Sequence, residues 1–156
     1  MKYYLIRHAQ TDANRLNRLA FGKYGAPINA VGQQNAMSIN SGLAKYGINT
    51  ADVTVAVSDL SRTKQTAQYA GFKCIVVNPL LNEINTNNPQ KTLELVAQNK
   101  VPKQATIMAR KIINNPPKEK VWVTHGLVIA AIQVELGLLD FAKFIPDYCE
   151  IRSIDI

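Results

Sequence analysis

Cysteine is scarce in this sequence, and so are long apolar runs. The two cysteines, Cys74 and Cys149, have no metal-ligand spacing, and nothing argues for a disulfide between them. The longest strongly apolar stretch, Gly126 to Ile132, is too short to span a bilayer. The N-terminal segment MKYYLIRHAQ has too few apolar residues before Arg7 for a signal-peptide core. We therefore expect a soluble, cytoplasmic protein with no membrane partner.

Acidic residues are outnumbered by basic ones. The 11 Asp and Glu residues face 18 Lys and Arg residues, which gives a net charge of +7. This excess favours anionic partners, although a basic surface that aids solubility explains it equally well. Only 7% of the residues are aromatic, and no run of Lys and Arg reaches four residues. Because nucleic-acid readers combine basic patches with stacking aromatics, we expect no nucleic-acid partner.

The length and composition indicate one globular domain. The chain has 156 residues, of which 47% are apolar and 19% charged, so it can bury a substantial core. It contains no internal repeat, low-complexity tract or linker. We therefore expect a single domain over residues 1–156. The sequence carries no signal of the oligomeric state.

Short apolar runs predict the strands. Nearly continuous apolar segments are typical of strands buried on both faces of a parallel sheet. Such segments are Tyr3 to Ile6, Val53 to Val57, Cys74 to Val77 and Val121 to Thr124. Cys74 is expected to pack there as a small hydrophobic residue. The alternating segment Ile151 to Ile156 predicts an edge strand.

Helical patterns lie between these strands. Helices are predicted around Ala36, Ile39, Leu43 and Tyr46, over Thr63 to Ala70, over Thr92 to Asn114 and over Gly126 to Leu136. Pro102 divides the third of these into two helices. The alternation predicts an α/β fold with a mostly parallel sheet flanked by helices. Within it, residues 85–120 are expected to form a short cap insertion over one end of the sheet, with Lys91 to Ile113 as its helical part.

Charged and polar residues that can bind or react with a ligand follow the predicted strands. These are Arg7-His8, Ser58 to Arg62, Glu83 and His125-Gly126. In open α/β sheets the ligand crevice lies at the carboxyl ends of the strands. The sequence therefore places two histidines, two arginines and one glutamate around a single pocket.

These residue types suit a phosphoryl group. Guanidiniums offer planar, forked donors to its oxygens, and helices that begin near Ser61 and Gly126 would direct backbone N–H groups at the same anion. A neutral imidazole can attack phosphorus, and nearby cations keep it neutral. A second histidine can act as a charged donor, and a carboxylic acid can protonate the leaving oxygen. No step requires a metal or another cofactor.

The same residues resemble a known family, the histidine phosphatase superfamily. Leu5 to Asn14, LIRHAQTDAN, resembles the signature LxRHGxTxxN, and FGKYGAPINAVGQQNA resembles the stretch that follows it. SDLSRTKQTA resembles SxLxRTxQTA, LNEI resembles the segment that carries the acid/base, and VTHG resembles the second-histidine motif. The resemblance covers nearly the whole chain in the right order.

The resemblance implies a phosphoglycerate mutase-like α/β sandwich whose last strand is antiparallel. It implies His8 as nucleophile, Arg7, Arg62 and His125 as phosphate ligands, Glu83 as acid/base and Asn14 as a further pocket residue. Two departures stand out. Ala9 replaces the family's Gly, and the segment after Glu83 reads NTNNPQ in place of FGxWEG.

The implied activity is hydrolysis of phosphomonoesters or of a phosphorylated protein side chain through a phosphohistidine. Two alternatives stay open: a phosphoglycerate mutase-type isomerase, and a pseudoenzyme that binds phosphorylated ligands without turnover. The stretch between Glu83 and His125 is short, whereas the resemblance implies a longer insertion in mutases. Hydrolysis is therefore favoured, with a phosphorylated small molecule or a phosphoprotein as the partner.

Overall fold

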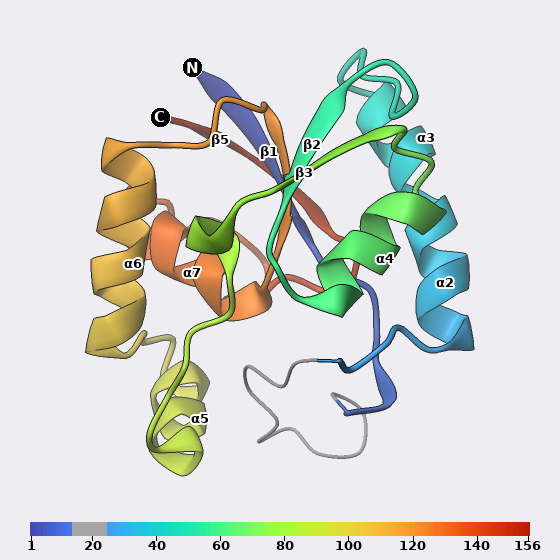
Figure 1. Cartoon of the computed structure of the whole chain (residues 1–156). Coiled ribbons are helices and arrows are strands. Elements are labelled where there is room, and N and C mark those ends of the chain that lie inside the picture. The colour runs from blue at the N-terminus through green and yellow to red at the C-terminus, as the bar shows by residue number, and fades with distance from the viewer. Residues whose placement is uncertain (14–24) are drawn as a thin grey trace.

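The computed structural model describes residues 1–13 and 25–156. At its centre is a five-stranded sheet in the order β3-β2-β4-β1-β5 (Figure 1). The pairs β1–β4, β4–β2 and β2–β3 are parallel, whereas β5 pairs antiparallel with β1. The expected α/β fold with a mostly parallel sheet is confirmed, and the last strand has the direction that the resemblance implied.

Helices and strands alternate along most of the described chain. The strands are β1 (Lys2–Arg7), β2 (Thr54–Val57), β3 (Cys74–Val77), β4 (Val121–Thr124) and β5 (Ile151–Asp155). The helices are α2 (Ala30–Met37), α3 (Ile39–Ala44), α4 (Ser61–Tyr69), the 3-10 turn η1 (Pro79–Leu81), α5 (Pro89–Ala97), α6 (Lys103–Asn114) and α7 (Gly126–Glu135).

Each face of the sheet has its own helical layer. Successive strand residues point to opposite faces, so Tyr3 and Leu5 pack with α6 and α7, whereas Tyr4 and Ile6 pack with α2, α3 and α4. Figure 1 shows these two sets of helices on opposite sides of the sheet. The central strands are therefore covered on both faces, which explains their continuous apolar runs.

β3 lies at an edge of the sheet, contrary to the expectation of burial on both faces. Val76 and Val77 are each 44% exposed, and Cys74 is an exposed free thiol. The prediction that Cys74 packs as a small hydrophobic residue is wrong, because β2 is the only neighbour that pairs with β3 among the described residues. An apolar run alone does not distinguish an edge strand from a central one.

The helix predicted around Ala36 is two helices, α2 and α3, which meet at Ser38. The Ser38 hydroxyl donates to the carbonyl of Asn35 at 2.7 Å, a local bond that competes with regular helical pairing. α2 begins earlier than its apolar residues suggested, because Asn29 caps it by accepting from the Gly32 N–H at 2.8 Å.

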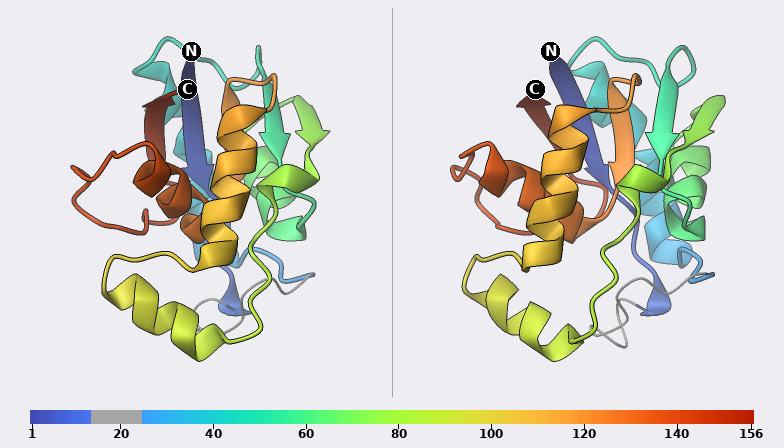
Figure 2. Two further views of the ribbon diagram at one scale, coloured as in Figure 1. Left: turned by 90° about the vertical axis from the view of Figure 1, so that its left-hand side faces the viewer. Right: turned by 60° about the vertical axis from the view of Figure 1, so that its left-hand side comes forward.

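The segment predicted as a cap divides into two parts with different positions. As expected, Pro102 separates two helices. However, α6 buries Ala105, Ala109 and Ile112 in the core against α7 and so belongs to a covering layer of the sheet. Both views of Figure 2 show α5 beyond the end of the sheet. Within residues 85–120, α5 and its flanking loops therefore remain the candidates for the expected cap.

The two chain ends lie side by side at the opposite end of the molecule from α5 (Figures 1 and 2). The Ile156 N–H donates to the Met1 carbonyl at 3.0 Å. Within the described residues, none of the helices combines the length and the apolar character needed to cross a membrane.

Candidate active site

Three strand ends bring the candidate residues together. Arg7 is the last residue of β1 and is in register with Thr124, the last residue of β4. Val57, at the end of β2, is in register with Val123. His8, Ser58 and His125 each follow one of these ends directly and are all buried. The predicted grouping at the carboxyl edge of the sheet is thus present for these residues.

The His8 ring is held in one tautomer. Its Nδ1 lies 2.7 Å from the carbonyl oxygen of Ala9, which can only accept a hydrogen bond. Nδ1 therefore carries the proton, and Nε2 carries the free lone pair. Burial, followed by the positive charges of Arg62 and Arg7, holds the pKa of His8 well below its usual value. The ring is thus neutral near pH 7, as a nucleophile requires.

The backbone after His8 is fixed from α4. The Ala9 N–H donates to the Thr66 hydroxyl at 2.9 Å, and that hydroxyl donates to the Arg62 carbonyl at 2.6 Å. Ala9 is fully buried and is not among the positive-φ residues of the described chain. The alanine that replaces the family's glycine is therefore accommodated without left-handed strain.

His125 is bonded to the loop after β2. Its Nε2 lies 2.9 Å from the Ser58 hydroxyl, which lies 2.8 Å from the Thr63 hydroxyl. Thr63 has carbonyl acceptors at Leu60 and Ser58 and therefore donates to one of them. Ser58 then donates to Thr63 and accepts from His125 Nε2–H. This assignment satisfies each of these groups and leaves His125 Nδ1 as the unprotonated nitrogen.

Nδ1 of His125 is buried, has no hydrogen-bond partner among the described residues and lies 3.7 Å from Glu83 Oε2. Burial is the largest cause that lowers the pKa of His125, and His8, Arg62 and Arg7 lower it further. Without a bound anion, His125 is therefore neutral near pH 7. A bound phosphoryl dianion would favour proton uptake at Nδ1 and make it a charged donor.

Glu83 is nearly buried, with 8% of its side chain exposed. Burial raises its pKa above the usual value, and this effect outweighs the Ile84 N–H, Arg62 and Arg7, all of which lower it. Its Oε1 accepts from the Ile84 N–H at 3.0 Å. A carboxyl group whose pKa is raised keeps its proton to a higher pH, which suits a general acid.

The two arginines supply the positive charge of the site. Arg62 is 3% exposed in the first turn of α4, and Arg7 is largely covered at the end of β1. Burial lowers the pKa of each, and Glu83 raises both. A guanidinium stays charged at pH 7 even so. Two fixed cations beside two neutral imidazoles make the site a receptor for an anion.

Other sequence predictions have different outcomes. Asn14 lies outside the described residues. Asp59, a second carboxylate in the SDLSRTKQTA motif, is half exposed and pairs with Lys64 at 2.7 Å, so it lies outside the buried cluster. Sequence reasoning gave no role to Ser58, Thr63 or Thr66, although all three belong to the SDLSRTKQTA motif.

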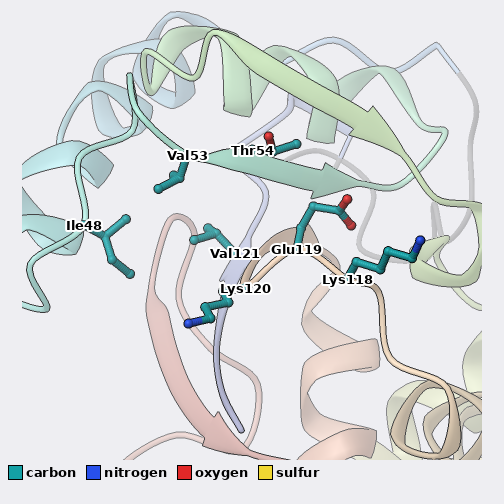
Figure 3. Close-up of a pocket in the computed structure, with 7 residues that line it drawn as sticks. All are labelled: Ile48, Val53, Thr54, Lys118, Glu119, Lys120 and Val121. Atoms are coloured by element: carbon teal, nitrogen blue, oxygen red, sulfur yellow. The ribbon is translucent and has the colours of Figure 1, made fainter.

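A separate hollow of about 350 Å³ lies where β2 and β4 begin, at the opposite end of these strands from His8. It is lined by Ile48, Val53, Thr54, Lys118, Glu119, Lys120 and Val121. Figure 3 shows its aliphatic side chains facing one another and the lysine ammonium groups pointing in different directions. The hollow contains none of the predicted site residues. Across residues 1–13 and 25–156, no group of three or more His, Cys, Asp or Glu is placed to hold a metal ion.

The burial of both histidines predicts that the protein loses stability in mild acid. The chain has only two histidines, and each has a pKa below that of the unfolded chain, which is near 6.5. Below pH 6.5 the unfolded chain gains protons that the folded protein does not bind. The free energy of unfolding should therefore fall by up to about 1.4 kcal/mol per pH unit for each histidine. Glu83, whose pKa is raised, opposes this trend between pH 4.5 and its folded pKa.

Urea unfolding between about pH 7.5 and pH 5 measures this dependence. The variant His8→Asn should show a shallower fall, because asparagine does not titrate in this range. An unchanged slope in that variant would show that His8 is not buried in its neutral form.

Comparison with known protein families identifies the chain. The profile of the histidine phosphatase superfamily (branch 1) matches residues 3–107. This range is more than half of the chain and includes His8, Arg62 and Glu83. The protein therefore belongs to the histidine phosphatase superfamily. His125 lies beyond the matched range, so its assignment depends on the VTHG motif and on the geometry of the site.

Solved structures share the fold. A phosphoglycerate mutase from Thermus thermophilus superposes with a TM-score of 0.76 at 22% identity, over 99% of this chain and 93% of that one. The protein TTHB049 from the same organism gives the same values. A mycobacterial glucosyl-3-phosphoglycerate phosphatase, solved with VO3, gives a TM-score of 0.67 at 18% identity, over 99% and 92% of the two chains. A search of curated protein sequences finds no significant match.

Proposed function

We propose that the protein is a metal-independent phosphatase that hydrolyses phosphomonoesters, or a phosphorylated protein side chain, through a phosphohistidine on His8. The observation that carries this proposal is the His8 tautomer. The Ala9 carbonyl fixes the proton on Nδ1, and burial keeps the ring neutral. Nε2 is then a nucleophile with its lone pair available, next to two guanidiniums that can bind the phosphoryl oxygens.

In this mechanism Arg7 and Arg62 hold the non-bridging oxygens, and His125 donates to one of them after taking up a proton at Nδ1. Nε2 of His8 attacks phosphorus, and the bond to the leaving oxygen breaks. Glu83, protonated because of its burial, gives its proton to that oxygen. The resulting carboxylate then accepts a proton from water, which attacks the phosphohistidine and releases inorganic phosphate with His8 restored.

The substrate class follows from the small size of the candidate cap. Since α6 packs in the layer beside α7, α5 and its loops are the part of the described segment 85–120 that is left to cover the crevice. A short cap encloses a small ester poorly, whereas an open rim admits a loop displayed on another protein. We therefore propose a broad range of small phosphomonoesters and keep a phosphoprotein as a candidate substrate.

Hydrolysis of para-nitrophenyl phosphate with direct measurement of inorganic phosphate tests the proposal. We expect phosphate release to continue after exhaustive treatment with EDTA, because every proposed role belongs to a side chain. Loss of activity in EDTA with recovery on adding a divalent ion would contradict metal independence. Binding without release would favour the pseudoenzyme. With phosphoglycerate as substrate, exchange of the phosphoryl position without net release would favour the mutase.

A further inference from the structure

The segment that precedes β5 encloses the Arg7 side chain. Arg7 Nη1 donates to the Pro146 carbonyl at 2.7 Å, and its Cζ lies 4.0 Å from the centroid of the Tyr148 ring. The backbone is tied to the same segment, because Arg7 N–H donates to the Glu150 carbonyl and its carbonyl accepts from Cys149 N–H. Both the backbone and the guanidinium of Arg7 are therefore fixed by one short stretch of chain.

α7 closes the other side of this enclosure. A Cβ added to Gly126 would lie 3.1 Å from Arg7 Nε and 2.8 Å from Ile145 Cγ2. The Arg7 side chain thus packs directly against Gly126, where any larger residue would collide with it. Its Nε is buried without a hydrogen-bond partner among the described residues. The guanidinium has little freedom to rotate between Gly126 and the Tyr148 ring.

The segment that carries Tyr148 is itself anchored by a buried residue of β5. Arg152 donates to the Glu150 carboxylate at 2.7 Å and to the Lys143 carbonyl at 2.7 Å. Cys149 has a φ of 61°, which a non-glycine residue keeps only when its surroundings determine it. The half-buried Tyr148 ring is therefore presented by an ordered turn, and its centroid lies 6.0 Å from that of the His8 ring.

We propose that Tyr148 is a positioning residue for phosphoryl transfer, which acts by holding the Arg7 guanidinium under its ring in the orientation that receives the phosphoryl oxygens. This inference rests on the proposed function of the site. An aromatic face beside a guanidinium stabilises its charge and restricts its rotation. The arginine side chain therefore loses less conformational entropy when the anion binds. Because Nη1 already donates to the Pro146 carbonyl, the Tyr148 ring fixes the direction of the Arg7 N–H groups that are left to bind the anion.

A double-mutant cycle on phosphate binding tests this role. Calorimetry with inorganic phosphate should show a smaller loss of affinity for Tyr148→Phe, about 3-fold, because the aromatic face is kept and only the hydroxyl, which also interacts with the Arg7 side chain, is removed. Tyr148→Leu, which keeps most of the volume without that face, should weaken binding on the order of 10-fold. In an Arg7→Ala background, Tyr148→Leu should cause no further loss, because the residue acts through Arg7.

Tyr46→Leu is the matched control. The Tyr46 ring contacts the Tyr4 ring at a tilted angle, with centroids 4.9 Å apart, on the face of the sheet that packs against α3. The substitution should lower the melting temperature without changing phosphate binding. Equal losses from Tyr148→Leu with and without Arg7 would overturn the inference, as would unchanged binding in Tyr148→Leu. Because binding is measured without turnover, failure of the phosphatase assay would not alter the outcome of this cycle.

Discussion

His8→Asn should abolish catalysis while the protein stays folded. The asparagine side-chain N–H can still donate to the Ala9 carbonyl, so the local hydrogen bond is kept and only the lone pair of Nε2 is lost. Removal of the nucleophile in a concerted active site costs on the order of 10⁴-fold or more in kcat. The same variant should form no phosphoenzyme. In the unmodified protein, labelled phosphate should survive an alkaline quench and be lost in acid, as expected of a phosphohistidine.

Far-UV circular dichroism and a thermal melt should be used to check that the variant is folded. Asp59→Asn is a suitable control, because Asp59 pairs with Lys64 at the surface and its removal leaves the buried cluster intact. It should keep full labelling and turnover. Labelling that persists in His8→Asn would move the nucleophile to another residue, and label that is stable in acid would argue against a histidine.

The sequence predicts the central features of the fold because each depends on local pattern. The runs at Tyr3 and Val121 lie in strands that are covered on both faces. The same pattern at Cys74 misleads, since burial depends on which strand occupies the edge of the sheet. Sequence periodicity also cannot show that α6 packs against α7 in a layer covering the sheet, whereas α5 lies beyond the end of the sheet.

For the site, the order of motifs predicts which side chains meet but not their protonation. Arg residues near Glu83 argue for a lower pKa, yet burial outweighs them. That balance depends on how completely the packed chain excludes water from the carboxyl group. Likewise, nothing in the sequence around Tyr148 connects it to Arg7, because the two are brought together only when β5 pairs with β1.

Glu83→Gln should impair the hydrolysis of alkyl phosphates far more than that of para-nitrophenyl phosphate. An alkoxide leaves poorly unless it is protonated, whereas nitrophenolate leaves unaided, so the loss of a general acid should cost about 10² to 10⁴-fold for the first and little for the second. Glutamine keeps the size of the side chain and the acceptor for the Ile84 N–H. Only the transferable proton is removed.

The pH dependence adds a second readout for the same residue. Because burial raises the pKa of Glu83, the protonated acid persists to a higher pH than an exposed glutamate, and kcat/KM for an alkyl ester should fall only as the pH rises past that raised value. In Glu83→Gln this alkaline limb should disappear, whereas Asp59→Asn should keep it. If Glu83→Gln lowers kcat/KM equally for the alkyl and the nitrophenyl ester and the fall at alkaline pH is retained, the proton donor is another residue. The selective loss, by contrast, would tie the leaving-group step to a carboxyl group whose acidity is set by its burial.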